Sequence, residues 1–95
     1  MVIVSGQLTV RSGTRERYVA ASLPSVVQAR ASAGCRDFVV APDPIDPERV
    51  NVYEEWDSAE ALMAFRGEGE LDPELAAMIV DASVARHEVA SSGPA

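Results

Sequence analysis

A carboxylate and the only tryptophan of the chain stand two residues apart, as Glu54 and Trp56, within the stretch Val50–Phe65. If this stretch begins as a strand, alternation places both side chains on one face, together with Val50 and Val52. A carboxylate on an apolar face is either held by a specific partner or titrates abnormally, because burying an unpaired charge is costly. Glu54 is therefore the first candidate for proton-transfer chemistry.

Two other side chains could take part in proton transfer. The only histidine, His87, belongs to the residue type that titrates near neutral pH, although a lone histidine near a chain end is also common at a surface or an interface. Arg30 could pair with Glu54, and this carboxylate would then be a structural group and not a base. The sequence leaves these alternatives open.

Several kinds of site are excluded or disfavoured by what the chain lacks. Cys35 is the only cysteine, so neither an intrachain disulfide nor a cluster of thiolates around a metal is possible. This thiol is either a small buried hydrophobe or a reactive group. There is no lysine for a Schiff base, and one histidine cannot form a multi-histidine metal site. We expect no metal site.

The charge distribution argues against nucleic acid as a partner. The net charge is −7, and residues 43–95 carry three arginines against thirteen acidic residues. Affinity for nucleic acid depends largely on cationic contacts to phosphate, which such a chain does not offer. Arg11, Arg15 and Arg17 do cluster, either as the solvated start of a helix or as a small anion site.

Length and composition indicate one small domain. The 95 residues are 47% hydrophobic and 24% charged, and no apolar run approaches the roughly 20 residues that span a bilayer. No basic segment precedes the first apolar residues, so no secretory signal is evident and we expect a cytoplasmic protein that does not bind membranes. Residues 1–90 are expected to form the domain, and residues 91–95 a flexible tail.

The first half of the chain predicts strand, helix, strand. Residues 2–10 alternate as a strand, in which Gly6 suggests a bulge or the close approach of a helix or a ligand. A helix follows up to Ala33, with a kink or a break expected near Pro24. Residues 35–41 then form a short strand, with Phe38 on one face and Cys35 on the other.

The second half predicts strand, helix, strand. The three prolines of residues 42–47 favour a stiff turn before the strand that ends at Trp56. Asp57 or Ser58 should cap the next helix, residues 67–70 should end it, and Asp72 followed by proline should begin another. Residues 82–89 form the last strand.

This order of elements predicts an α+β, ferredoxin-like βαββαβ fold, in which helices cover one face of an antiparallel sheet. The other face is left open. If Ile3, Phe38 or Tyr53 lies on that face, it is apolar enough to require a partner, and a homodimer that pairs two open sheet faces satisfies it.

Several segments, in this order and at this spacing, resemble the antibiotic biosynthesis monooxygenase domain, a family of dimeric α/β-barrel architecture. The resemblance rests on Gly13 before the first helix, Ala29-Arg30 near its end, Gly34-Cys35-Arg36-Asp37-Phe38, the Asp-Pro loop before Arg49-Val50, and Glu54-Glu55-Trp56 followed by residues 58–62.

The resemblance implies a homodimer with a pocket between sheet and helices in each subunit. Some members oxidise anthrone-type aromatic compounds with molecular oxygen and without flavin, haem or metal, so no cofactor is expected and a small aromatic or quinol-type ligand is. Glu54 and His87 are the candidate catalytic residues. Trp56, Phe65, Leu62 and Arg30 are the candidate ligand-binding residues, although Trp56 could equally be core packing.

Departures from the family's pattern favour some functions over others. Relatives that degrade haem use an asparagine on the first strand and a histidine on the second helix; the first is absent here, and the segment Ala64-Phe65-Arg66 replaces the second. Anthrone oxidases rely on a further tryptophan and an asparagine, and Asn51 points away from Trp56. A non-catalytic module for ligand binding or dimerisation therefore stays open beside the oxygenase.

Overall fold

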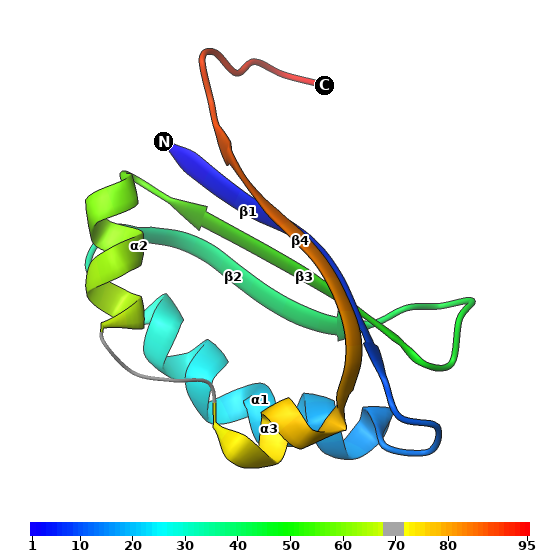
Figure 1. Cartoon of the computed structure of the whole chain (residues 1–95). Helices are drawn as coiled ribbons and strands as arrows, with labels where there is room; N and C mark the ends of the chain where they lie inside the picture. Colours follow the sequence, from blue (N-terminus) through cyan, green and yellow to red (C-terminus); the bar gives the residue numbers. More distant parts are fainter. Residues whose placement is uncertain (68–71) are drawn as a thin grey trace.

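The computed structural model describes residues 1–67 and 72–95 as a four-stranded sheet with three helices (Figure 1). The elements in chain order are β1 (Val2–Val10), α1 (Arg15–Arg30), β2 (Cys35–Pro42), β3 (Arg49–Trp56), α2 (Ala59–Arg66), α3 (Pro73–Met78) and β4 (Ile79–Glu88). No helix in these residues is long and apolar enough to cross a membrane.

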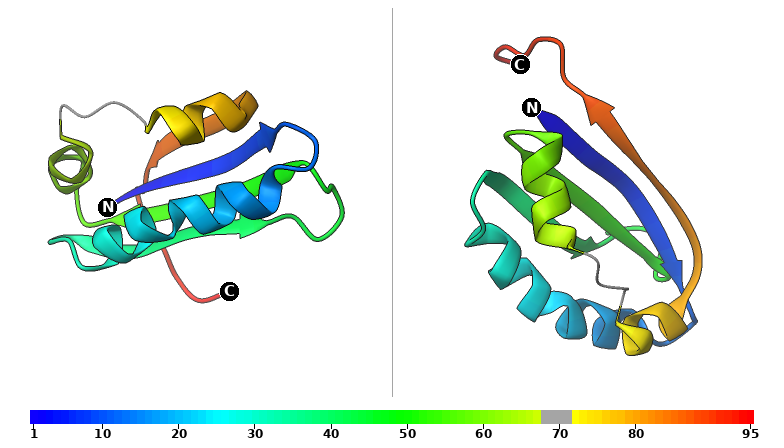
Figure 2. Two further views of the ribbon diagram at one scale, coloured as in Figure 1. Left: turned by 90° about the horizontal axis from the view of Figure 1, so that it is seen from below. Right: turned by 60° about the vertical axis from the view of Figure 1, so that its left-hand side comes forward.

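The strands lie in the order β2-β3-β1-β4, and every neighbouring pair is antiparallel. All three helices lie on the same side of the sheet, and the opposite face carries no helix (Figure 2). The predicted ferredoxin-like arrangement is thus confirmed. β4 begins at Ile79, earlier than expected, because the chain leaves α3 directly into pairing with Val10.

The alternation predicted for the two central strands is confirmed. Val4 pairs with Glu54 and Val2 with Trp56, so these side chains share the face that the helices cover. Two groups of buried residues fill this side: Leu8, Val10, Tyr18, Val50, Leu75 and Met78 at one end, and Val2, Val4, Trp56 and Leu62 at the other. The core therefore consists of two halves along the strands.

Helix α1 passes through Pro24 without a break, contrary to one of the two expectations for this segment. The proline lies on the exposed side, where the missing amide donor weakens the helix without disturbing its packing on the sheet. The buried side of α1 carries Tyr18, Ser22 and Ala29, whereas Leu23 is 59% exposed. The face that meets the sheet is thus built largely from small residues.

Glycine is required at position 6 because a neighbouring strand approaches closely. The sequence had suggested a bulge or the approach of a helix or a ligand. The φ of Gly6 is +152°, and a Cβ at this position would lie 2.0 Å from the carbonyl oxygen of Ser83 on β4. Only glycine permits this approach between β1 and β4.

The face predicted for Cys35 is wrong. The register of β2 against β3 shifts between Cys35 and Asp37, and a bulge of this kind changes which residues share a face. Cys35 therefore packs with Phe38 against the helix-covered half of the core that contains Trp56. Phe38 is accordingly absent from the open face, which carries Ile3 and Tyr53.

The proline-rich segment forms the predicted turn, held by one arginine. Nη1 of Arg15 donates to the carbonyl oxygens of Asp43 at 3.1 Å, Asp46 at 2.6 Å and Arg49 at 3.4 Å. Within the turn, the Asp43 carboxylate accepts hydrogen bonds from the amides of Ile45 and Asp46. At least one of the clustered arginines is thus a structural residue.

The capping residues of α2 and α3 agree with those predicted from the sequence. Ser58 caps α2, since its Oγ accepts from the amide of Ala61 at 3.1 Å, while Asp57 pairs with Arg36 instead. Asp72 caps α3 and Pro73 occupies its first turn, as predicted. Helix α2 ends at Arg66 and is followed by Gly67 with φ +57°, and the rest of the predicted break, residues 68–70, lies outside the described residues.

Candidate functional site

A cavity of about 260 Å³ lies between the sheet and the helices. Its wall combines strands and helices: Val4, Leu8, Phe38, Val39, Val40, Val52, Glu54, Ile79 and Val84 from the sheet, and Tyr18, Ser22, Ser25, Arg66 and Leu75 from the helices. Most of these side chains are apolar. The cavity therefore offers an apolar slot with few polar groups, which is the usual composition of a small-molecule site.

The cavity lies where the two halves of the core fail to meet. Leu8 and Tyr18 from one half and Val4 from the other all line it, and the sheet row between them consists of Val40, Val52 and Gly6. Gly6 contributes no side chain to this row. The serines that α1 turns toward the sheet are also small, so neither layer fills the space between them.

Among residues 1–67 and 72–95, Glu54 is the one carboxylate in the cavity wall. Its Oε1 accepts a hydrogen bond of 3.0 Å from Nε1 of Trp56, two residues further along β3. It is flanked on the sheet by Val4 and Phe38. The carboxylate is thus held by an uncharged donor in apolar surroundings, and the sequence expectation of a specific partner for Glu54 is met by Trp56.

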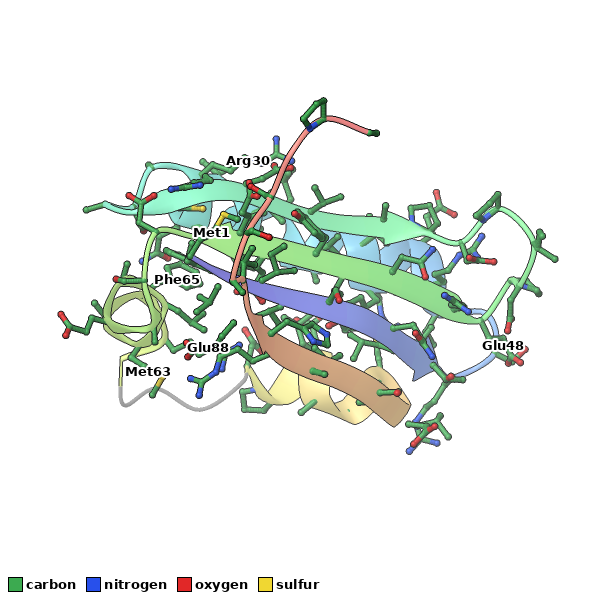
Figure 3. All side chains as sticks on the ribbon, turned by 90° about the horizontal axis from the view of Figure 1, so that it is seen from above. Met1, Arg30, Glu48, Met63, Phe65 and Glu88 are labelled. Carbon is green, nitrogen blue, oxygen red and sulfur yellow. The ribbon has the colours of Figure 1, made fainter. Side chains whose placement is uncertain are left out.

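Trp56 and Leu62 lie one layer behind the cavity. Both are fully buried, and neither belongs to the cavity wall. Phe65 packs on the Trp56 ring with centroids 5.3 Å apart, and meets the edge of Phe38 at 5.7 Å. Trp56 and Phe65, which were predicted to line the pocket, therefore form an aromatic cluster behind it. Phe38 belongs to the same cluster and is the member that lines the cavity. Figure 3 shows Phe65 beside the end of the sheet near α2.

Arg30 does not form the expected ion pair with Glu54. Its Nε donates to the carbonyl oxygen of Phe38 at 2.8 Å, and within residues 1–67 and 72–95 the ion pairs are Arg36–Asp57 and Arg49–Asp43. Figure 3 places Arg30 at the outer edge of β2. The guanidinium therefore ties the end of α1 to the edge strand instead of reaching the cavity.

His87 lies on the other side of the sheet from Glu54. It pairs with Ile3 of β1, whereas Arg86, its neighbour, pairs with Val4. Ile3 belongs to the open face, so the imidazole and the Glu54 carboxylate are separated by the sheet within one chain. The structure does not bring the two candidate catalytic residues together.

Two polar groups in the cavity wall were missed by the sequence interpretation. Arg66 ends α2, and Tyr18 lies in the first turn and a half of α1. Arg66 was visible as the basic residue that follows Phe65 in the stretch around Trp56. Tyr18 gave no such signal, because a tyrosine at a helical core position is usually explained by packing alone.

Cys35 is a partly buried thiol that packs against the core cluster around Trp56. Burial, with smaller contributions from the carboxylates of Asp37 and Glu54, raises the pKa of its thiol. No group of three histidine, cysteine, aspartate or glutamate side chains in the described part of the chain could hold a metal ion. The cavity chemistry thus depends on one carboxylate, one guanidinium and several hydroxyls.

A second, larger depression of about 650 Å³ lies outside the core, between the start of α1 and the proline turn. It is lined by Gly13, Arg15, Glu16, Val19, Ala20, Pro42 and Pro47. Arg15 is already engaged by the turn carbonyls. This groove is open to solvent and its arginine is already used by the turn, so the inner cavity is the better candidate site.

The fold is shared with several solved structures. A protein from Deinococcus radiodurans assigned as an antibiotic biosynthesis monooxygenase is 17% identical and superposes with a TM-score of 0.80, covering 100% of this chain and 98% of its own. A Nitrosomonas europaea protein with the same assignment is 14% identical, with a TM-score of 0.80 over 96% and 100% of the two chains. One from Chloroflexus aurantiacus reaches 24% identity and a TM-score of 0.72, over 97% and 96%.

At these identities the structures establish the fold and not the reaction. Among curated proteins, none matches the sequence. The family model described as antibiotic biosynthesis monooxygenase matches residues 1–72, which include β1 to β3 and the Glu54–Trp56 pair. The chain therefore belongs to the antibiotic biosynthesis monooxygenase family.

Proposed function

We propose that this protein is a cofactor-independent monooxygenase that acts on a small aromatic or quinol-type metabolite. The observation that carries the proposal is the position of Glu54: a carboxylate, oriented by the indole of Trp56, that faces an apolar cavity of about 260 Å³. Ligand sites commonly occupy roughly 300–1,000 Å³, so a volume just below this range suits a compact aromatic ligand.

The first chemical step is removal of a proton from the ligand. The Glu54 carboxylate accepts the proton of a phenolic hydroxyl, and the resulting phenolate is far more electron-rich than the phenol. Arg66, at the cavity wall, supplies a positive charge that stabilises this anion. Because the indole N–H of Trp56 fixes the carboxylate in advance, little reorganisation is needed when the ligand arrives.

The deprotonated ring then reacts with molecular oxygen directly. The hydroxyl that Glu54 deprotonates is that of the enol form of the ligand, so one of the two methylene hydrogens has already moved to this oxygen and passes to Glu54 as a proton. The ring gives one electron to oxygen, and the two radicals combine at the former methylene carbon, which now carries one hydrogen, to form a peroxide that takes the proton back from Glu54. Loss of water from this peroxide leaves a carbonyl at that carbon: one oxygen atom enters the product, and the other leaves as water with the two methylene hydrogens. The four electrons all come from the ligand, so no external reductant is required.

Oxygen uptake in metal-free buffer tests this function. With an anthrone as substrate, we expect uptake that depends on the protein and stops under anaerobic conditions. Glu54→Gln should lower the rate by about a hundredfold or more, since general-base catalysis typically contributes 10²–10⁴-fold. Glu60→Gln, which makes the same change on the exposed side of α2, is the matched control and should keep the wild-type rate. Equal rates for wild type and Glu54→Gln would rule out the base role.

The position of His87 favours a second candidate, a ligand-binding module without catalysis. The cavity wall contains no histidine, and its one carboxylate already accepts a hydrogen bond from Trp56. The same experiment separates the two: binding of the anthrone without any oxygen uptake, for this and for other electron-rich phenols such as a dihydroxynaphthalene, would identify a binding module.

The open face of the sheet supports the proposed homodimer. It carries Tyr53, Ile3 and Ala85 on the adjacent strands β3, β1 and β4, on the side that none of the described helices covers (Figure 3). Pairing with a second sheet would bury these side chains. In such a dimer His87 would lie at the interface, where it could still influence assembly.

A further inference from the structure

Tyr18 has a feature that core packing does not explain. The residue is only 5% exposed, yet its hydroxyl has no hydrogen-bond partner among residues 1–67 and 72–95. In the same residues, no polar side-chain atom sealed from solvent lacks a partner. The hydroxyl oxygen is therefore not enclosed by apolar groups, and the space next to Tyr18 is the cavity that it lines.

Ser22 and Ser25 are the other hydroxyl residues of α1 that line the cavity, and each is already hydrogen-bonded or exposed to water. Ser22, one turn further along, donates its hydroxyl to the carbonyl oxygen of Val19 at 2.8 Å, so it does not need a ligand. Ser25 lines the cavity but is exposed to water. Tyr18 is thus the buried polar group of the helix layer that depends on whatever fills the cavity.

Tyr18 and Glu54 line the cavity from different halves of the core and from different layers. Tyr18 on α1 packs in the half that contains Leu8 and Val50, whereas Glu54 on β3 lies next to Val4 in the other half. Val52 and Val40 lie in the sheet between the two halves. The intervening row is apolar, so a flat ligand that spans it presents one edge to each polar group.

The two groups require different chemistry from the ligand. An ionised Glu54 carboxylate accepts hydrogen bonds but has no proton to donate, whereas a phenol can donate one. Burial raises the pKa of Tyr18, so its hydroxyl keeps the proton at neutral pH. The Glu54 end therefore suits a hydroxyl of the ligand, and the Tyr18 end suits an acceptor oxygen.

We infer that the Tyr18 hydroxyl is a specificity-determining contact, which donates a hydrogen bond to a ketone-type oxygen at the ligand's end opposite to the hydroxyl that meets Glu54. The inference rests on the proposed ligand site. Water can pair with the Tyr18 hydroxyl while the cavity is empty, but a ligand that fills the cavity without an acceptor oxygen removes this water and leaves the hydroxyl unpaired, so the site discriminates against such a ligand.

The test compares two probes of the same shape. One is a hydroxytetralone whose phenolic hydroxyl and ketone lie on opposite rings; the other is the tetrahydronaphthol with the same carbon skeleton and no ketone. Titration followed by Trp56 fluorescence or by calorimetry gives both dissociation constants. We expect wild-type protein to bind the ketone about fivefold more tightly, the size of one net hydrogen bond. Tyr18→Phe should abolish this preference and leave the affinity for the tetrahydronaphthol unchanged.

A matched variant and the remaining outcomes separate the two hypotheses. Tyr53→Phe removes the only other phenolic hydroxyl, which lies on the opposite face of the sheet, and should keep the fivefold preference. Binding of both probes with the same preference in wild type and Tyr18→Phe would overturn the role of Tyr18 but leave the ligand site intact. Binding of neither probe by wild-type protein would overturn the ligand site and the role of Tyr18 together.

Discussion

The indole Nε1 of Trp56 donates a 3.0 Å hydrogen bond to Oε1 of Glu54, and this bond joins the core to the cavity. Trp56 is fully buried and cannot contact a ligand directly, whereas Glu54 lines the cavity. In the proposed site, the tryptophan acts through the carboxylate that it holds. A residue pair two positions apart on one strand thus connects the buried core to the cavity wall.

The first prediction concerns the two members of this pair. Trp56→Phe removes the donor and leaves a gap in the core, and it should lower the free energy of unfolding by about 2 kcal/mol. Glu54→Gln should change it by less than about 1 kcal/mol, because the amide oxygen still accepts the bond. Denaturant titration of both variants checks the difference, and equal losses would contradict the structural role assigned to the indole.

Gly6 gives a second prediction. Gly6→Ala places a methyl group 2.0 Å from the Ser83 carbonyl oxygen and must separate β1 from β4, so we expect a loss of about 3 kcal/mol in unfolding free energy. Gly93→Ala is the control, because nothing lies within 4 Å of a Cβ there and no stability change is expected. A tolerated Gly6→Ala would mean that the strands at this point are further apart than the structure shows.

The third prediction is a dependence of stability on pH. Hydrogen bonds to the Asp43 carboxylate, from the Asp46 amide first and then from the Asn51 side chain and the Ile45 amide, lower its pKa to about 2. A carboxyl group whose pKa is lower in the folded state stabilises the fold above the pKa of the unfolded chain, which is about 3.9. This contribution is lost as the pH falls from about 4 to about 2.

Melting temperatures of wild type and Asp43→Asn between these pH values measure the effect. Wild-type protein should lose more stability on acidification than Asp43→Asn, whose side chain does not titrate. Parallel pH profiles for the two proteins would show that the hydrogen bonds to Asp43 do not depend on its charge.

A fourth prediction follows from the burial of Cys35. Because the pKa of its thiol is raised, alkylation by iodoacetamide at neutral pH should be much slower than for a free cysteine. The rate should rise at a higher pH than it does for an unperturbed thiol. Protein unfolded in denaturant is the control and should react at the normal rate, whereas fast reaction of the native protein would show that Cys35 is an accessible, activated thiol.

The proposed dimer gives a fifth prediction. Ile3→Arg places a charge on the open sheet face and should shift the protein toward the monomer in sedimentation experiments. Val27→Arg introduces the same charge on the exposed outer side of α1 and should leave the assembly state unchanged. A wild-type protein that sediments as a monomer at all concentrations would exclude dimerisation through this face.

Most of the fold could be predicted because its signals are local. The alternation of residues 2–10 and 50–56 set the two central strands, and Ser58, Asp72 and Pro73 marked the starts of two helices. Where a local signal competed with tertiary packing, it gave the wrong result. Pro24 did not interrupt α1, and a bulge between Cys35 and Asp37 reversed the expected face of Cys35.

The sequence by itself determined that Glu54 and Trp56 share a face, since strand geometry depends only on neighbouring residues. Tertiary structure decided which side chains meet at the cavity. The distance of Arg30 from Glu54, the position of His87 beyond the sheet and the entry of Tyr18 and Arg66 into the wall all depend on pairing and packing between elements far apart in the chain. Such contacts are set by register and by the volumes that facing layers leave unfilled, and neither is encoded in a single segment.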